Sequence, residues 1–401
     1  MGRNLDFEPV RALRQLVRIY SVTDSPAEQQ ALAWSAEQFN RMGVDYKRVP
    51  KRGADGQIEE GQYAAIIAMV SGRGSGLKKL AVISDGHIDV VKKGKNWTKR
   101  AGMMEGTEMF GRGTTDMKSA VVAQILAARL ARDSRDLPFD YYALVVAGEE
   151  TTGWGTEQAV KYIQPEWKRY PNLVAIIPEP TSYIDEETGR KGTKVMYGNM
   201  GCFSAQIVIQ GETGHAATAR GKVNAIEVGM EVGIALKSLR EKWQDTYKDA
   251  SLGIPLLTPT LTEGGVAANS LPPGNTLRYD GRFPIELKGN YEKDLIKALE
   301  GFKGIDSKIL YYANPAYTVP DHPWIKANLQ SFGESMPGVP LWTTDGCFFT
   351  DADIPLVIAG PGYLNKLHVV DEKCDTSLIP LWAEKSIAAG RFYVASLKQA
   401  A

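Results

Sequence analysis

Short, fully apolar runs alternate with helical patterns in this sequence, and that alternation limits the folds open to the chain. Four runs each fit one strand buried on both faces, at residues 80–83, 141–147, 173–177 and 355–359. Apolar residues at helical spacing lie between these runs, most clearly over residues 115–131. The same spacing follows the last run, from residue 378 onward. Buried strands separated by helices are typical of an α/β domain. The sequence therefore predicts a mostly parallel sheet flanked by helices.

The pattern changes near residue 195, where a different kind of strand begins. Apolar and polar residues alternate over residues 202–210, which indicates a strand exposed on one face. A helix, two strands, a second helix and a final strand follow, and this βαββαβ order is that of a ferredoxin-like α+β domain. We therefore expect an α/β domain interrupted by an inserted α+β domain. The expected boundaries are residues 1–196, 197–313 and 314–401.

The charge balance argues against two classes of partner. The chain has 47 Lys and Arg against 47 Asp and Glu, so neither nucleic acid nor an anionic membrane is an expected partner. The longest apolar runs, such as residues 64–70, are far shorter than the ~18 residues that span a bilayer. Cys202, Cys347 and Cys374 are too scattered to form a disulfide framework. We expect a soluble, cytoplasmic protein.

Histidine and acidic residues follow the predicted buried strands. His87 and Asp89 come after the first, and strand spacing puts both side chains on the same side. The carboxylate of Asp89 would then accept the second ring N–H of His87 and orient the ring toward a metal. A lone loop histidine beside an unrelated aspartate is the alternative. Asp116 lies in a glycine-rich turn that lacks the phosphate-loop pattern, and it would either bind a cation or cap the next helix.

Glu149 and Glu150 directly follow the apolar run 141–147. Two carboxylates at a buried strand end repel each other unless a cation or a proton lies between them. With a divalent metal present, one can be a ligand while the other takes a proton from water. A solvated acidic loop is the alternative. Glu179 follows the next strand and His368 lies beyond the last, so these residues mark the strand ends where α/β sheets build their sites.

The motifs around these residues resemble those of the cocatalytic zinc aminoacylases and exopeptidases, in the same order and over essentially the whole chain. That family includes acetylornithine deacetylase, succinyl-diaminopimelate desuccinylase, carboxypeptidase G and aminoacylase. The resemblance rests on Ser-Asp-Gly-His-Ile-Asp at residues 84–89, Gly-Arg-Gly-Thr-Thr-Asp-Met-Lys-Ser at residues 111–119 and Gly-Glu-Glu-Thr-Thr-Gly at residues 148–153. It implies a mixed, zinc-exopeptidase-like sheet flanked by helices, with the inserted domain acting as a lid or dimerisation domain.

The resemblance also implies a metal content and a role for each residue. It implies two Zn²⁺ per chain, with Co²⁺ or Mn²⁺ as substitutes. The first zinc would be held by three residues, His87, Glu179 and Asp116. The second would be held by Glu150, His368 and the same, bridging Asp116. Glu149 would be the general base, and Asp89 would support the ligands from behind.

Three residues of the inserted domain also match the family. His215, in a Gly-His-Ala-Ala turn, would reach the active site of the partner in a homodimer, or else merely cap its own turn. Arg282 would bind a substrate carboxylate with two N–H groups, or else be a surface arginine on a strand. Asn269 would contact substrate, or only shape the Pro-Pro turn after it. Residues 342–348 lack the arginine that ends this loop in desuccinylases, so a succinyl group is not an expected ligand.

The leading hypothesis is a dinuclear zinc amidohydrolase that cleaves N-acyl amino acids or related small amides, with water activated by the metals and Glu149. A metallo-dipeptidase or carboxypeptidase acting on small peptides is the alternative, because the same site can hydrolyse a peptide bond. Glu179 in place of Asp favours deacylation within the family. Two further alternatives are a binding protein that has lost catalysis, although Glu149 is present, and a cysteine hydrolase using Cys347 or Cys374 with His368, which no motif supports.

Overall fold

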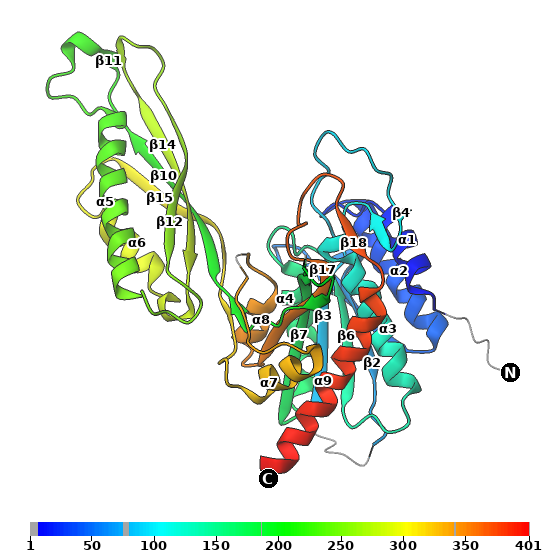
Figure 1. Ribbon diagram of the computed structural model, residues 1–401. Helices are drawn as coiled ribbons and strands as arrows, with labels where there is room; N and C mark the ends of the chain where they lie inside the picture. Colours follow the sequence, from blue (N-terminus) through cyan, green and yellow to red (C-terminus); the bar gives the residue numbers. More distant parts are fainter. Residues whose placement is uncertain (1–6, 75–79, 186, 341, 401) are drawn as a thin grey trace. The chain divides into compact units, whose positions relative to one another are not determined.

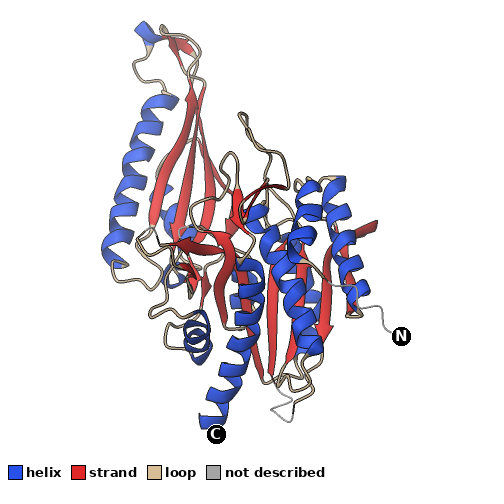
Figure 2. Cartoon of the chain, turned by 45° about the vertical axis from the view of Figure 1, so that its right-hand side comes forward, coloured by secondary structure: helices blue, strands red, loops and turns tan. Residues whose placement is uncertain are grey.

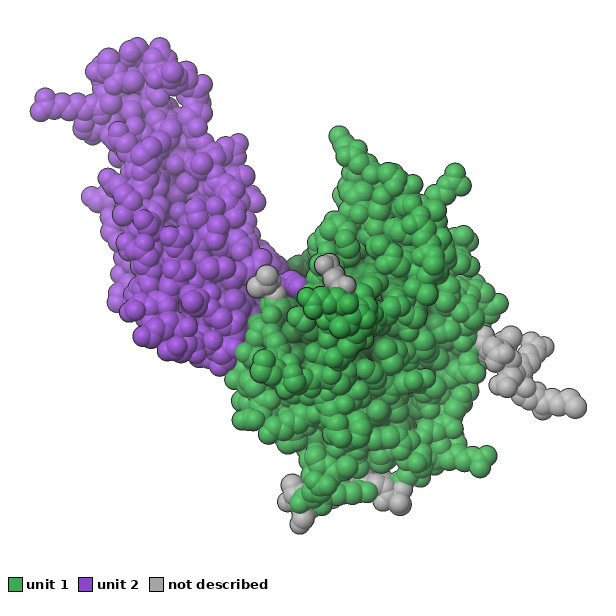
Figure 3. Space-filling view, in the orientation of Figure 1, with its two compact units in different colours: residues 1–198, 317–340, 344–401 green, residues 199–316, 341–343 purple. Residues whose placement is uncertain are grey.

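The chain folds as two compact units, one inserted into the other (Figure 3). The computed structural model describes residues 7–74, 80–185, 187–340 and 342–400. The first unit comprises residues 1–198, 317–340 and 344–401, and the second comprises residues 199–316 and 341–343. The chain leaves the first unit at β9 (Gly198–Asn199) and returns to it at β16 (Ala316–Tyr317).

The first unit is built on a seven-stranded sheet within the described part of the chain (Figure 1). Six strands run in the order β1-β2-β6-β3-β7-β17, and β8 pairs with β7. Their bounds are β1 (Asp45–Arg52), β2 (Ile58–Val70), β3 (Leu80–His87), β6 (Asp140–Val146), β7 (Asn172–Ile184), β8 (Lys191–Thr193) and β17 (Leu356–Tyr363). Neighbours from β6 to β17 are parallel, whereas β1, β2 and β8 pair antiparallel. The sheet is therefore mixed, as the resemblance implied, and not mostly parallel.

Helices pack against this sheet and against one another (Figure 2). Their bounds are α1 (Pro9–Arg18), α2 (Pro26–Met42), α3 (Ser119–Asp133), α4 (Trp154–Trp167), α7 (Pro323–Phe332), α8 (Gly346–Asp351) and α9 (Leu378–Ala400). Every residue of β6 from Tyr141 to Val146 is buried, and Tyr141, Ala143 and Val145 join the core shared with α3 and α9. A strand buried on both faces needs a layer on each side, which the apolar runs predicted. None of the described helices is long and apolar enough to cross a membrane.

A small three-stranded sheet joins two distant parts of the first unit. It contains β4 (Met103–Glu105), β5 (Glu108–Phe110) and β18 (Lys373–Asp375), with β5 in the middle. The glycine-rich turn with Asp116 follows β5, and β18 follows His368. The pairing of β5 with β18 therefore brings the Asp116 and His368 segments to one place.

The second unit has the expected βαββαβ order. It runs through β10 (Gly201–Gln210), α5 (Ala225–Thr246), β12 (Leu256–Gly264), β14 (Gly274–Phe283), α6 (Tyr291–Leu299) and β15 (Ile305–Ala313). The antiparallel strand order is β12-β14-β10-β15, so β12 and β15 are the edges. A minor pair, β11 (Gly214–His215) and β13 (Ser270–Leu271), lies outside this sheet. The core includes Phe203 and Phe283, whose rings stack on Tyr291.

Two local expectations are corrected by the structure, and one strand was not expected. The helix expected from residue 115 begins at Ser119, because Asp116 and Met117 have non-helical backbone angles inside a short turn, η1 (Thr114–Lys118). The strand expected to end at residue 177 continues to Ile184 as β7. The edge strand β1 carried no apolar signal, because Val49 is its one fully buried residue among those described.

Gly155, in the first turn of α4, offers a test of how tightly this helix packs beside the strand end that precedes Glu149. A Cβ at Gly155 would lie 2.0 Å from the carbonyl oxygen of Ala147, a backbone atom that cannot rotate away. We expect Gly155→Ala to lower the free energy of unfolding by about 1–3 kcal/mol, as overpacking does. Urea denaturation followed by circular dichroism measures the change.

Gly233, in the middle of α5, is the matched control. A Cβ there would meet only Tyr279 Oη, at an ordinary 3.7 Å. Gly233→Ala should therefore be neutral or stabilise the protein by up to about 1 kcal/mol through helix propensity. Equal stability of the two variants would contradict the close packing of α4.

Candidate metal centre

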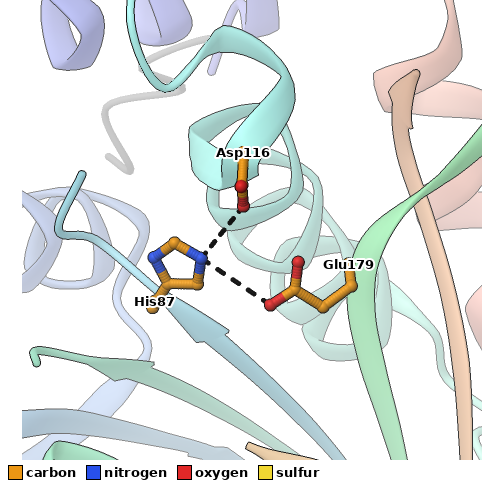
Figure 4. A group of neighbouring side chains, drawn as sticks. All are labelled: His87, Asp116 and Glu179. Atoms are coloured by element: carbon orange, nitrogen blue, oxygen red, sulfur yellow. Dashed lines mark hydrogen bonds and ion pairs between the residues drawn. The ribbon is translucent and has the colours of Figure 1, made fainter. Parts of the chain in front are cut away.

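Five side chains form two overlapping groups of metal-ligand type in the first unit. In each group, one ligand atom per residue lies within 4.8 Å of the others. His87 Nε2 lies 3.2 Å from Asp116 Oδ1 and 3.6 Å from Glu179 Oε1 (Figure 4). His368 Nε2 lies 3.3 Å from Asp116 Oδ2 and 3.2 Å from Glu150 Oε2. The two oxygens of Asp116 thus face different histidines, as in a carboxylate that bridges two cations.

The strand order explains why these residues meet. His87 is the last residue of β3, and Glu149 and Glu150 follow the end of β6. Glu179 lies on β7, which continues past it instead of ending before it as expected. Since β6, β3 and β7 are parallel neighbours, residues near their carboxyl ends share one edge of the sheet.

Asp116 is held in place by a buried ion pair between Arg112, in its own turn, and Glu372, in a distant segment. Glu372 accepts hydrogen bonds from the backbone N–H groups of Thr115, at 2.8 Å, and of Asp116, at 3.1 Å. Arg112 donates to Glu372 at 2.6 Å and to the carbonyl oxygen of His368 at 3.3 Å. The pair therefore connects the turn that carries Asp116 with the segment that carries His368.

The loop after β6 is held by two further carboxylates. Asp89 accepts from the N–H groups of Glu149 and Glu150, each at 3.2 Å, through different oxygens. Glu28, on α2, accepts from the N–H of Gly148 at 3.0 Å. Three successive backbone donors are thus satisfied by buried acids. This fixes the loop and leaves the side chains of Glu149 and Glu150 free to serve the site.

The ring of His87 is oriented by a backbone group more closely than by the expected side chain. Its Nδ1 lies 3.0 Å from the carbonyl oxygen of Asp89 and 3.6 Å from the carboxylate of the same residue. A carbonyl only accepts, so Nδ1 donates to it, and in the neutral ring that a metal would bind, Nε2 is the nitrogen with the lone pair. Nε2 therefore faces Asp116, Glu179 and, at 3.9 Å, Glu149 as a metal ligand would.

The histidines titrate under the influence of the surrounding carboxylates. Burial alone would lower the pKa of His87, but hydrogen bonds to Asp116 and Asp89 raise it well above the usual value. Hydrogen bonds to Asp116 and Glu150 raise the pKa of His368 to about 10. The site therefore stabilises positive charge at both places where a cation would bind.

The acidic residues show the complementary effect. Burial raises the pKa of Glu149 and Glu179 well above the usual value, with further contributions from Asp345 and Asp116 respectively. Burial and the charge of Asp116 raise that of Glu150, whose Oε1 is buried without a hydrogen-bond partner in the described structure. Divalent cations would supply the missing opposite charge and an electrophilic partner for this oxygen. Two histidines and three carboxylates are a donor set that suits such ions, including Zn²⁺.

The other three expected site residues belong to the second unit. His215 is exposed, and its Nδ1 accepts from the N–H of Ala217 at 3.1 Å, so it does cap its own turn. Arg282 is paired with Asp280 through Nε at 2.9 Å and Nη2 at 3.2 Å, so its guanidinium fork is occupied. Asn269 is exposed, and its backbone carbonyl oxygen accepts a hydrogen bond from the backbone N–H of Ala216.

Glu28 and Glu372 were not identified as functional from the sequence. Residues 25–28 read as a helix capping box, yet the Ser25 side chain caps nothing and Glu28 reaches Gly148 instead. Glu372 follows Asp371 a few residues beyond His368, and only its burial beside Arg112 distinguishes it. A single acid with a distant partner leaves no local pattern.

The cysteine-hydrolase alternative finds no support in the structure. Cys347 and Cys374 are both buried. Burial raises the pKa of Cys374 well above the usual value, so its reactive thiolate form is disfavoured.

Known proteins resemble this chain in sequence and in fold. The acetylornithine deacetylase of Aliivibrio fischeri is 29% identical over 337 residues, which cover 80% of this chain and 82% of that protein. An M20 family metallo-carboxypeptidase of Sulfolobus solfataricus is 16% identical, with a TM-score of 0.73 over 97% of this chain and 100% of that one. A dinuclear metal-binding M20 peptidase of Bacillus subtilis is 13% identical, with a TM-score of 0.66 over 97% and 98%.

The family model described as peptidase family M20/M25/M40 matches residues 83–385, which include all five residues of the two ligand groups. The match spans most of the chain, and the chain therefore belongs to peptidase family M20/M25/M40, a family of hydrolases that act on amide bonds.

Proposed function

We propose that this protein is a dinuclear metal amidohydrolase that removes the acyl group from N-acyl amino acids. The observation that carries the proposal is the placement of Asp116 between His87 and His368, with one carboxylate oxygen toward each. His87, Asp116 and Glu179 would hold one Zn²⁺, and Asp116, Glu150 and His368 the other, with Co²⁺ or Mn²⁺ as substitutes. Bound there, the cations would polarise the amide carbonyl and acidify a water molecule.

Glu149 is the proposed general base. It takes a proton from the attacking water and returns it to the leaving amine, as a carboxylate beside the first ligand group is placed to do. Asp89 supports this step indirectly, because it holds the backbone of Glu149 and the ring of His87 in place. Glu149 lies 3.9 Å from His87 Nε2, close to the first ligand group without belonging to it.

Deacylation is preferred over peptide hydrolysis for two reasons. The acetylornithine deacetylase of Aliivibrio fischeri is a relative over most of both chains. The resemblance also associates Glu rather than Asp at position 179 with deacylases. A dipeptidase or carboxypeptidase acting on small peptides is the second candidate, favoured by the fold shared with the Sulfolobus solfataricus metallo-carboxypeptidase.

The second unit is the proposed lid and dimerisation domain. Its edge strand β12 is almost wholly exposed and presents Leu256 and Leu261 to solvent. Met230 and Ile234, four residues apart on the neighbouring helix α5, are also exposed, at 64% and 67%. An open edge strand beside an exposed apolar helix face suits pairing with a second copy of the chain. We infer a homodimer formed through this surface.

His215, Arg282 and Asn269 are the proposed contributions of this domain to catalysis. Because Nδ1 of His215 accepts the N–H of Ala217, the ring proton lies on Nε2, which can donate to an oxyanion in the partner's site. Arg282 would bind the substrate α-carboxylate by exchanging Asp280 for it. Asn269 would also contact the substrate.

Metal content is the first test of this function. Protein purified without chelator should contain two divalent ions per chain and hydrolyse N-acyl amino acids. Removing the ions should abolish activity and lower Tm, since ions at 100 times their Kd stabilise a fold by about 2.7 kcal/mol. Elemental analysis, activity assays and thermal denaturation measure the three quantities. Full activity of a metal-free preparation would contradict the proposal.

Substitutions of the adjacent Glu149 and Glu150 distinguish the proposed general base from a proposed metal ligand. Glu149→Gln should reduce kcat by about 10²–10⁴ while leaving two ions bound, because a base acts on water and not on the metal. Glu150→Gln is the matched control, one residue further along the same loop, and should lose an ion as well as activity. Equal metal loss in the two variants would show that these assignments are wrong.

Subunit mixing tests the role of His215. Homodimers of His215→Ala and of Glu149→Ala should each be nearly inactive, because one oxyanion donor is worth ~3–4 kcal/mol. In a mixed dimer, the subunit with His215→Ala keeps Glu149 and receives the intact histidine of its partner. About a quarter of wild-type activity should return after statistical exchange between twofold-related subunits. Verified exchange without recovered activity would show that His215 does not act across the interface.

A further inference from the structure

We propose that the basic segment over residues 92–100 selects substrates with a net negative charge, and so favours N-acyl amino acids over dipeptides. This inference rests on the proposed function and names the substrate class of the same site. The segment reads Lys-Lys-Gly-Lys-Asn-Trp-Thr-Lys-Arg, with five basic residues and no acidic one, in a chain of zero net charge.

The segment lies beside the candidate metal centre within the first unit. It begins three residues after Asp89. Asp371, three residues after His368, accepts the N–H groups of Thr98, at 2.9 Å, and Lys99, at 3.0 Å. These contacts anchor the segment against the stretch of chain that carries a proposed metal ligand.

A second contact links the basic segment to His368 through Arg112. The guanidinium of Arg112 lies 5.3 Å from the ring centre of Trp97 and donates to the carbonyl oxygen of His368 at 3.3 Å. The side chain of His368 is 51% exposed, so this proposed ligand is open to solvent. The basic segment therefore borders the open side of the site.

Three of the five positive charges are available to a passing anion. Lys92, Lys95 and Arg100 are exposed, and each lacks an ion-pair partner among the described residues. The other two are engaged, since Lys99 pairs with Glu105, and Lys93 lies over the rings of Tyr20 and Trp97. The engaged side chains hold the segment in place, and the free ones set its charge.

The charge of the occupied site explains why such a segment is needed. Four carboxylates, Asp116, Glu149, Glu150 and Glu179, would cancel the four positive charges of two divalent cations. The centre itself therefore exerts little net attraction on an anion. An N-acyl amino acid with an uncharged side chain carries a free carboxylate and no α-ammonium group, so it is an anion, whereas a dipeptide with uncharged side chains is a zwitterion at neutral pH. Fixed surface charges raise the encounter rate and local concentration of the anion alone.

The test removes the three available charges together. The triple variant Lys92→Gln, Lys95→Gln, Arg100→Gln should lower kcat/KM for an N-acetyl amino acid about three- to tenfold at low ionic strength. We expect kcat itself to be unchanged, and kcat/KM for a dipeptide to be unchanged. The difference from wild type should shrink from 0.01 M to 0.15 M salt, as the Debye length falls from about 30 Å to about 8 Å.

A control triple makes the same charge change at the other end of the helices. Arg135, Lys168 and Lys398 are exposed and lie just past α3, just past α4 and near the end of α9. The first two are separated from the site by helix lengths of about 20 Å. Their replacement by Gln should leave kcat/KM for both substrates unchanged.

Binding measured without turnover gives a second readout. In a Glu149→Gln background, calorimetry should show that the Lys92, Lys95, Arg100 triple weakens binding of the N-acetyl amino acid and not of the dipeptide. Equal effects of the two triples, or equal effects on the two substrates, would overturn the inference while leaving the proposed function intact. If wild-type protein hydrolyses neither substrate, the proposed function itself is wrong.

Discussion

Four carboxylates gathered around His87 and His368 place the main physical constraint on this molecule: Asp116 and Glu179, which are buried, and Glu149 and Glu150, which are partly buried. Two like charges 4 Å apart repel by about 4 kcal/mol at an effective dielectric constant of 20. Several such pairs together rival the 5–15 kcal/mol that typically separates a folded domain from its unfolded chain. Burial raises the pKa values of Glu149 and Glu179, and the neighbouring carboxylates raise them further. The rest of the first unit has to hold the group together until cations offset it.

Backbone N–H groups provide much of that restraint. Glu28, Asp89 and Glu372 accept from the loops that carry Gly148 to Glu150 and Asp116. Each of these acids lies outside the two ligand groups, so the loops are fixed without using the side chains that face the cations. Such outer contacts orient ligands in metal sites generally. Arg112 extends the restraint to His368, which makes the ion pair with Glu372 a link between two parts of the centre.

The sequence predicted β3, β6, β7 and β17, the strands with apolar runs, but not β1, β2 or β8. The proposed ligand residues were identified from their places after the predicted strands and from the resemblance. Apolar runs identify strands buried on both faces, and polar residues near the ends of parallel strands gather at one edge. The contacts that fix those residues are not local. Glu372 and Thr115 are 257 positions apart, and Glu28 and Gly148 are 120 apart, so no spacing rule connects them. The irregular turn at Asp116 was likewise hidden, since its sequence is compatible with a helix.

The insertion of the second unit between the two halves of the first has a consequence for biosynthesis. His87, Asp116 and Glu179, the three ligands of one group, are all translated before the inserted unit begins. His368, which completes the other group, is translated only after that unit has ended. Glu372, which holds the turn that carries Asp116, is also translated after the inserted unit, so the ribosome-bound chain must wait for both groups. For the proposed metal set, both sites reach their full arrangement only when the last part of the chain has joined the first unit.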